Sequence, residues 1–458
     1  MVDTEQHSEL RKNIGFSVAT SIVIGTVIGS GIFMKPGIIL SSAGNSKMAM
    51  LAWIIGGIIT LASGLTISEI SVKIPKTGGL YAYLETVYGK LWGFLCGWIQ
   101  SVIYAPAVIG ALGLYFGSIF ADLFGIEQHN KIWIGIMVVL FLTILNLLGT
   151  KYGGFIQIGS TIGKMVPIFL IAIFGLWKGN GNILMQESGV AADHISMGAA
   201  VLATLWAYDG WINVGFMAGE MKNPSKTLPK AIISGILFVM FAYIAVNAAL
   251  FHVLSGKQIV HLGANSASYA SQILFGPVGS KLITIGILIS IFGCLNGKLL
   301  TFPRIPYAMA ESKLVPASRF ISWVHPKSKT PVGATVLVVI ISLILMLCWD
   351  PDRLSNIAIF SVFTFYGLAF FALFILRKRD PDNGRNLYKV PLYPVTPIIA
   401  ILGVIYIVGS TLIDSPKDTI LSIICTIIGL PVYKFMIKRN HTASLPVVSA
   451  IQEKTTEQ

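Results

Sequence analysis

Charged residues are scarce in this sequence. Only 12% of its 458 residues are Asp, Glu, Lys or Arg, against roughly 25% in a typical soluble domain. The hydrophobic fraction is 54% and the mean hydropathy is +0.77. A soluble fold cannot bury many separate apolar runs of roughly 20 residues, the length that crosses a ~30 Å hydrocarbon core. The composition therefore excludes an ordinary soluble enzyme and predicts a polytopic membrane protein.

Other absences narrow the class further. All four cysteines lie in apolar runs, so the sequence indicates no disulfide framework. The seven histidines fall in loops, tails or span ends, without the paired spacing of a zinc site. The glycine–lysine pairs at Lys164 and Lys298 lack the spacing and the following hydroxyl residue of a phosphate-binding loop. We therefore expect no cofactor, no metal ion and no enzymatic activity.

The apolar runs lack period-two alternation and are therefore predicted to be helices, which satisfy their own backbone in lipid. We predict twelve transmembrane helices, at residues 14–40, 46–72, 91–122, 130–149, 155–178, 198–219, 230–254, 279–302, 331–349, 355–377, 393–414 and 417–437.

An even number of spans puts both termini on one side of the membrane. Most of the lysines and arginines fall in the tails and loops of that side, and the opposite loops hold few, Lys35 among them. The positive-inside rule then predicts cytoplasmic termini. Basic loops facing an anionic leaflet also account for the net charge of +13, so we expect no nucleic-acid partner.

Two spans contain an interruption near their midpoints. The first reads Gly-Ser-Gly at residues 29–31, and the second reads Asp209-Gly210 between aromatic residues. Glycine costs a helix ~1 kcal/mol relative to alanine, and a charged residue interrupts an apolar helix. Paired interruptions at matching positions of two halves point to a binding site at the membrane midplane. A packing motif of small residues is the alternative.

The two interruptions lie five spans apart, and a repeat of five spans must be inverted in the membrane. We therefore predict a cytoplasmic tail at 1–13, a first five-helix repeat at 14–178, an inverted repeat at 197–377, two additional transmembrane helices at 393–437 and a cytoplasmic tail at 438–458.

Unwound backbone suits a particular ligand. The N-terminus of a half-helix presents N–H groups and a positive dipole end, which favour a carboxylate. The end of the preceding half-helix presents carbonyl groups, which favour an ammonium group. A zwitterionic amino acid carries both groups, so the sequence predicts an amino acid as the substrate.

Several motifs together resemble a known family. They are residues 25–33 (GTVIGSGIF), 75–81 (PKTGGLY), 207–211 (AYDGW), 220–224 (EMKNP) and 308–311 (AMAE). In order and spacing they are similar to the amino acid–polyamine–organocation superfamily, in its L-amino acid transporter branch, over nearly the whole chain. The resemblance implies an all-α LeuT-type fold of two inverted five-helix repeats plus two C-terminal helices.

The resemblance also implies a substrate site. The substrate carboxylate would bind the backbone amides of Ser30 and Gly31 beside Gly29, and the ammonium would bind carbonyls near Val27, Trp206 and Asp209. Trp206 takes the place of an aromatic gate that is usually phenylalanine in this branch, and Asp209 stands where the branch often has glycine. The candidate substrate-binding residues are Val27, Gly29, Ser30, Gly31, Trp206 and Asp209.

Lys164 lies ten positions into the fifth span, where burying a charge costs about 2.5–3.5 kcal/mol on insertion scales. The family places a lysine there beside the first interruption, where related sodium-coupled transporters bind a cation. The ammonium group of Lys164 could replace that ion, or it could make only a structural hydrogen bond. Gly25, Tyr243 and Cys294 are further candidates for a role in conformational change.

Three other polar residues have open roles. Asp209 could bind the ammonium group, carry a proton or cap the second half-helix, as aspartate often does. Lys298 is interpreted as extending toward the cytoplasmic surface. Glu69 is interpreted as pairing with a loop lysine, with proton transport as the alternative.

We predict an exchanger of small neutral L-amino acids, such as serine, threonine and alanine, that works by sodium-independent alternating access in the plasma membrane. A proton-coupled symporter is the alternative, and a membrane-embedded enzyme or sensor lacks any visible catalytic constellation. Some eukaryotic members join a heavy subunit through a cysteine between the third and fourth spans. Residues 121–130 contain none, so we expect no heavy subunit.

Overall fold

The computed structural model describes residues 14–76, 78–190, 195–379 and 388–455, without the side chains of residues 150, 151 and 440–455. The described chain is helical apart from connecting segments and three isolated bridges. The helices are α1 (Phe16–Val27), α2 (Gly31–Met34), α3 (Pro36–Ala43), α4 (Ser46–Lys73), α5 (Leu80–Tyr88), α6 (Lys90–Ile99), the π-helix η1 (Gln100–Tyr104), α7 (Ala105–Phe124), α8 (Lys131–Leu148), α9 (Thr150–Lys178), α10 (Met197–Tyr208), α11 (Asn213–Phe216), α12 (Pro224–Val253), α13 (Gly256–Leu262), α14 (Ser266–Thr301), α15 (Arg304–Glu311), α16 (Ser318–Ile321), α17 (Val332–Cys348), α18 (Pro351–Arg379), α19 (Val395–Asp414) and α20 (Pro416–Thr455).

Within the described residues, ten helical stretches are long and apolar enough to cross a membrane, and α10 and α17 are shorter apolar helices. Their outward faces are apolar as well. Phe155 on α9 is 79% exposed, and Ile413 on α19 is 81% exposed. Surfaces of this kind would aggregate in water, whereas lipid chains solvate them. The chain is therefore a multi-pass membrane protein.

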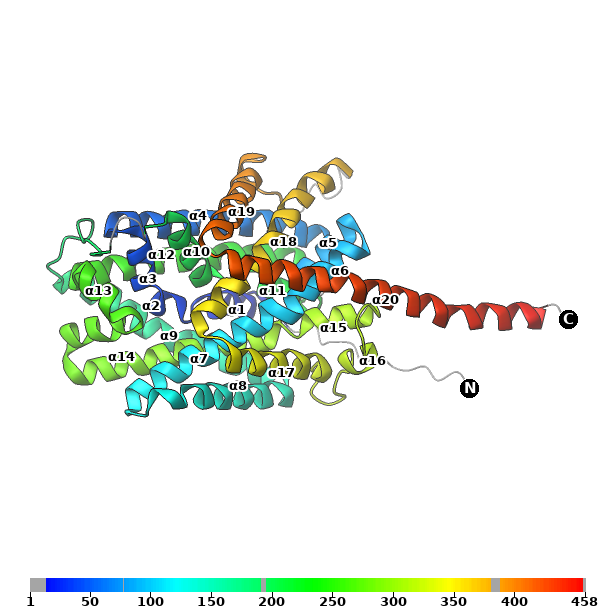
Figure 1. Cartoon of the computed structure of the whole chain (residues 1–458), viewed down its shortest axis with the longest axis horizontal. Coiled ribbons are helices and arrows are strands. Elements are labelled where there is room, and N and C mark those ends of the chain that lie inside the picture. The colour runs from blue at the N-terminus through cyan, green and yellow to red at the C-terminus, as the bar shows by residue number, and fades with distance from the viewer. Residues whose placement is uncertain (1–13, 77, 191–194, 380–387, 456–458) are drawn as a thin grey trace.

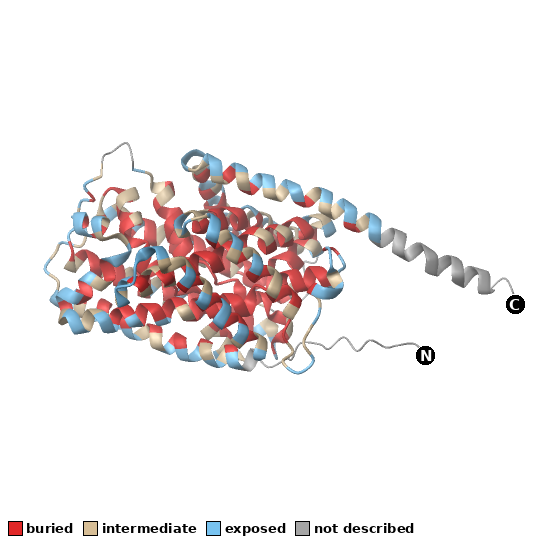
Figure 2. Ribbon diagram, turned by 60° about the horizontal axis from the view of Figure 1, so that its bottom comes forward, coloured by how far each residue is buried: buried red, intermediate tan, exposed pale blue. Residues whose placement is uncertain are grey.

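The buried residues concentrate inside the bundle, and exposed residues lie along its outer helices (Figure 2). The segments α1 and α2 run through the middle of the bundle (Figure 1). There α1 packs against α9, α12 and α14, while α10 packs against α3, α4 and α19. The two interrupted segments thus occupy the protein interior, where unpaired backbone groups are shielded from lipid.

Most helices coincide with the spans predicted from sequence, but several of their ends differ. The predicted span 331–349 corresponds to α17, and the predicted span 279–302 corresponds to the second part of α14. That part begins where Gly276 adopts a positive φ of 75° and Pro277 follows it, an arrangement in which glycine ends one helix and proline opens the next. The predicted tail 1–13 lies outside the described residues, and α20 continues past the predicted boundary at 438 to Thr455.

Candidate functional site

Both predicted interruptions are present. The helix α1 ends at Val27, residues 28–30 are non-helical, and α2 begins at Gly31. In the second segment α10 ends at Tyr208, and α11 begins only at Asn213. The helix α1 packs against α11, whereas α2 packs against α10. The two broken segments therefore run in opposite directions, with their interruptions at the same level.

Glycines allow the interruptions to come together. A Cβ added to Gly31 would lie well under 3.0 Å from the Cα of Ala207, a distance that real Cβ atoms essentially never show. Gly210 adopts a positive φ of 118°, and a Cβ there would lie 2.6 Å from the carbonyl oxygen of Thr26. The Thr26 hydroxyl lies within hydrogen-bond distance of the Gly210 carbonyl, at 3.0 Å, so the two interruptions meet directly.

Backbone donors at the start of α2 lack partners. Nothing in the described part of the chain accepts a hydrogen bond from the N–H groups of residues 29–32. The buried hydroxyl of Ser30 likewise has no partner among the described residues. A buried N–H group without an acceptor is costly, so this cluster of donors is suited to bind a negatively charged group.

The carbonyl groups at the interruptions are, by contrast, mostly satisfied by side chains. The Tyr243 hydroxyl lies within hydrogen-bond distance of the carbonyls of Val27 (3.1 Å) and Ala207 (2.9 Å), one from each broken segment. The Cys294 thiol donates to the Thr26 carbonyl at 3.1 Å. Tyr243 and Cys294 thus contact the backbone of the interruptions, and their role in conformational change stays a prediction.

Lys164 is fully buried and reaches from α9 into the first interruption. Its ammonium group donates to the carbonyls of Gly25, at 2.8 Å, and Ile28. No ion pair with a carboxylate is recorded for it within the residues described. The Ser290 hydroxyl lies 3.3 Å from the Gly29 carbonyl on the same side. The Lys164 side chain therefore contacts the unwound backbone directly, and its role in place of a bound cation stays a prediction. Sequence reasoning missed Ser290, whose local sequence is that of an ordinary helix residue.

The interpretation of Lys298 was wrong. Its side chain is only 2% exposed, and its ammonium group lies 2.6 Å from a carboxylate oxygen of Asp209. The Tyr104 hydroxyl donates to the other oxygen at 2.7 Å. The Lys298 side chain therefore does not extend toward the membrane surface. It stays inside the bundle, where the Asp209 carboxylate compensates its buried charge.

The capping role considered for Asp209 was also wrong. Its carboxylate is occupied by Lys298 and Tyr104, and the residue preceding α11 is Ile212, which makes no side-chain cap. Tyr104 is the last residue of the π-helix η1. The π-helical turn forms there because Pro106 has no N–H group to donate to the preceding turn. This local widening presents Tyr104 to Asp209. The proline was visible in the sequence, but its partner in space was not.

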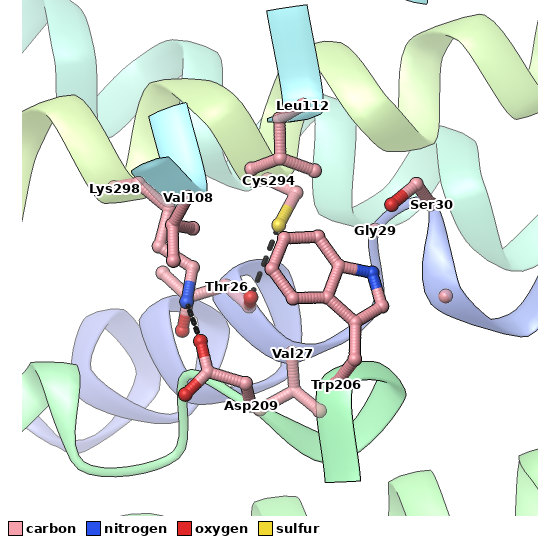
Figure 3. Close-up of a pocket in the computed structure, with 11 residues that line it drawn as sticks. Thr26, Val27, Gly29, Ser30, Val108, Leu112, Trp206, Asp209, Cys294 and Lys298 are labelled. Atoms are coloured by element: carbon pink, nitrogen blue, oxygen red, sulfur yellow. Dashed lines mark hydrogen bonds and ion pairs between the residues drawn. The ribbon is translucent and has the colours of Figure 1, made fainter. Parts of the chain in front are cut away.

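The interruptions line a small pocket whose free space is about that of a single water molecule. In Figure 3 the indole ring of Trp206 lies across the pocket, with Ser30 and Gly29 on one side and the Lys298–Asp209 pair on the other. Val108 and Leu112 of α7 also line the pocket. Its lining residues are Thr26, Val27, Gly29, Ser30, Gly31, Val108, Leu112, Trp206, Asp209, Cys294 and Lys298.

All six residues predicted to bind substrate line this pocket. Of the four conformational candidates, Cys294 lines the pocket. Lys164, Tyr243 and Gly25 lie outside it, next to the backbone of the broken segments that line it. A Cβ on Gly25 would overlap the Gln157 side chain, so Gly25 allows α1 and α9 to approach closely.

Glu69, the other candidate proton carrier, lies away from the pocket. Its carboxylate pairs with both Nε and an Nη atom of Arg377, at 2.9 and 2.6 Å, and accepts the Val390 amide at 2.7 Å. The predicted structural pair is therefore present, but its partner is an arginine at the end of α18 rather than a loop lysine.

Apolar spans around two broken helices and a polar pocket define a membrane transport protein rather than an enzyme. Residues 14–431 match the family described as amino acid permease, and the chain belongs to this family. The family resemblance found in the motifs is thus confirmed.

Individual relatives agree with this assignment. The chain is 55% identical over 430 residues to the serine/threonine exchanger SteT of Bacillus subtilis (strain 168). The matched region covers 94% of this chain and 98% of the relative. It is 30% identical to the human large neutral amino acids transporter small subunit 2, over 93% of this chain and 80% of the relative. It is 28% identical to the human cystine/glutamate transporter, over 94% of this chain and 87% of the relative.

Proposed function

We propose that this protein exchanges small neutral L-amino acids of the serine, threonine and alanine class across the plasma membrane by sodium-independent alternating access. The unpaired N–H groups at residues 29–32 carry the proposal, because they lie at the pocket and suit a carboxylate. The 55% identity to a serine/threonine exchanger supports the substrate class and the exchange reaction.

The substrate binds with its carboxylate at the amides of Ser30 and Gly31. Its ammonium group approaches the carbonyl groups of Val27 and Trp206. These carbonyls already accept hydrogen bonds from Tyr243 and from the Asp209 amide, at 3.1 and 3.2 Å, and a carbonyl has a second lone pair for the ammonium. The narrow pocket beneath Trp206 favours a small side chain. Asp209 contributes through its backbone, since Lys298 neutralises its carboxylate.

Proton coupling is the less supported alternative. A proton carrier needs a carboxylate whose charge can be removed at low cost during the cycle. Asp209 is paired with Lys298 at 2.6 Å and Glu69 with Arg377 at 2.6 Å, so protonating either would leave a cation unpaired. Sodium coupling is disfavoured by Lys164, whose ammonium group occupies the carbonyl groups at the first interruption.

The proposed architecture is a LeuT-type bundle of twelve transmembrane helices. Two inverted repeats at 14–178 and 197–377 are followed by two helices at 393–437. The opposite directions of the two broken segments and the shared level of their interruptions support the inversion. Both termini are proposed to be cytoplasmic from the distribution of lysine and arginine. The chain is proposed to work without a heavy subunit, because residues 121–130 offer no cysteine for one.

Transport by purified protein in liposomes tests the proposal. Liposomes preloaded with serine should take up labelled serine much faster than empty ones, and threonine and alanine should compete, with no requirement for sodium or a pH gradient. Empty liposomes that take up serine only with a pH gradient would instead support the symporter. Equal uptake by empty and preloaded liposomes would contradict exchange.

A further inference from the structure

A recess in the outer surface of the bundle lies between α18 and α20, apart from the substrate pocket. It has a free volume of about 130 Å³ and is lined by residues of Phe360–Thr364 in α18 and of Ser422–Ile427 in α20. Ile423 and Ile427 at its edge are 45% and 54% exposed. The recess therefore opens toward the surrounding lipid rather than into the bundle.

The recess suits hydrocarbon rather than water. Four of its lining residues carry hydroxyl groups, and each hydroxyl donates to a carbonyl of its own helix, at 2.8–3.2 Å: Ser361, Thr364, Ser422 and Thr426. A buried water needs two to four polar partners, whereas an apolar cavity of comparable size stays dry and admits an apolar ligand. With its hydroxyl protons already donated, the recess favours an apolar occupant.

The depth of the recess is that of an acyl chain. Its lining residues lie five to ten positions from the outer ends of the predicted spans 355–377 and 417–437. At 1.5 Å per residue this is roughly 8–15 Å below the outer surface in the proposed orientation. One leaflet contributes about 15 Å of hydrocarbon, so the recess lies within the outer leaflet.

A charged rim of Asp350, Arg353, Lys417 and Asp418 lies above the recess, at the outer ends of the same two helices. Arg353 donates through Nε to Asp418 at 3.0 Å, and its guanidinium lies 5.2 Å from the centre of the Trp349 ring. A guanidinium has five N–H donors, so its terminal groups remain for a phosphate, and Lys417 is exposed beside it. Two basic and two acidic side chains together complement a headgroup that carries both charges.

We propose that the recess binds one zwitterionic phospholipid of the outer leaflet, with an acyl chain between α18 and α20. Its phosphate lies at Arg353 and Lys417, and its amine lies at the carboxylates of the charged rim. Among the long apolar stretches of the described residues, the one in α20 is the least buried, and α20 packs only against outer parts of the bundle, including α6 and α18 (Figure 1). The lipid chain thus supplies packing between α18 and α20 that the protein lacks.

The lipids retained by the full-length protein test this site. The protein is purified in mild detergent from liposomes with equal amounts of phosphatidylethanolamine and phosphatidylglycerol, and bound lipid is counted by native mass spectrometry. We expect one retained phosphatidylethanolamine per chain. Thr426→Phe places a ring in the recess and should reduce this retention roughly tenfold. Removing lipid should lower the thermal midpoint of the parent chain but not that of Thr426→Phe, because the ring fills the space that the acyl chain leaves.

Ile424→Phe is the matched control, since Ile424 lies on the same helix, is 48% exposed and does not line the recess. It should retain lipid as the parent chain does. The double variant Arg353→Gln, Lys417→Gln should lose the preference for phosphatidylethanolamine. A sharp thermal transition shows that each variant is folded, and Ile427→Trp replaces Thr426→Phe if the latter lacks one.

Several results would overturn the proposal. They are no retained phospholipid in the parent chain, retention by the folded blocking variant within twofold of the parent, or an equal loss in Ile424→Phe. Equal retention of the two lipids by the parent chain would refute the zwitterionic headgroup. A parent dimer that the blocking variant separates would show instead that a second copy of the chain fills the recess.

Discussion

Gly31→Ala tests the contact that brings the two interruptions together. The added methyl group would overlap the backbone of Ala207, with its Cβ under 3.0 Å from the Ala207 Cα. Non-bonded carbon atoms prefer separations of 3.5–4.0 Å, so α2 would have to move by roughly 1 Å. Overpacking of this kind costs typically 1–3 kcal/mol. Because the overlap is with backbone, a change of rotamer cannot relieve it.

The displacement moves the N–H groups of Ser30 and Gly31 relative to the opposite side of the pocket. If the cost falls on the substrate-bound state, 1–3 kcal/mol corresponds to a roughly 5- to 150-fold increase in the KM for serine. We would measure KM and kcat for serine exchange in preloaded liposomes, together with the thermal stability of the purified protein, to separate loss of binding from loss of folding.

Gly154→Ala is the control for this prediction. Gly154 lies in α9, and a Cβ there would meet nothing within 4 Å. Alanine should stabilise that helix by up to ~1 kcal/mol and leave exchange unchanged. If Gly31→Ala exchanged serine with the parent KM, the close approach of the two interruptions would be irrelevant to binding, and the reasoning behind the site would fail.

Three further substitutions test other contacts of the site. Lys164→Met removes the donor to the Gly25 and Ile28 carbonyls and should lower kcat for exchange at least tenfold, since each buried acceptor left unpaired costs ~1–3 kcal/mol. A kcat equal to that of the parent chain would make the lysine purely structural. Lys298→Met should abolish exchange and lower thermal stability, because it leaves the Asp209 carboxylate without its partner. Adding Asp209→Asn should recover stability by removing that uncompensated charge, and equal stability of the single and double variants would contradict this coupling. Tyr243→Phe should weaken serine binding modestly, by ~1 kcal/mol or about fivefold in KM, because the hydroxyl contacts carbonyls of both broken segments; a KM unchanged within error would show that this bridge is dispensable.

The sequence by itself determined the spans, the two interruptions and the candidate site around them. Each of these depends on local chemistry: the length of an apolar run, the low helix propensity of Gly29-Ser30-Gly31, and the cost of a charge within a span, as at Lys164. For that reason most helices coincide with the apolar runs, although α14 begins earlier and α20 continues further than predicted. Every candidate chosen at the interruptions lies at the pocket or directly behind it.

The tertiary structure alone decided which charges are paired. Lys298 lies 89 positions from Asp209 in the chain, and Lys35 lies 317 positions from Asp352. Nothing in the local sequence distinguishes a lysine that extends to the membrane surface from one that turns inward to a carboxylate on another helix. A charge is stable inside the bundle only where packing brings a compensating partner within hydrogen-bond distance, and that packing is a property of the assembled helices.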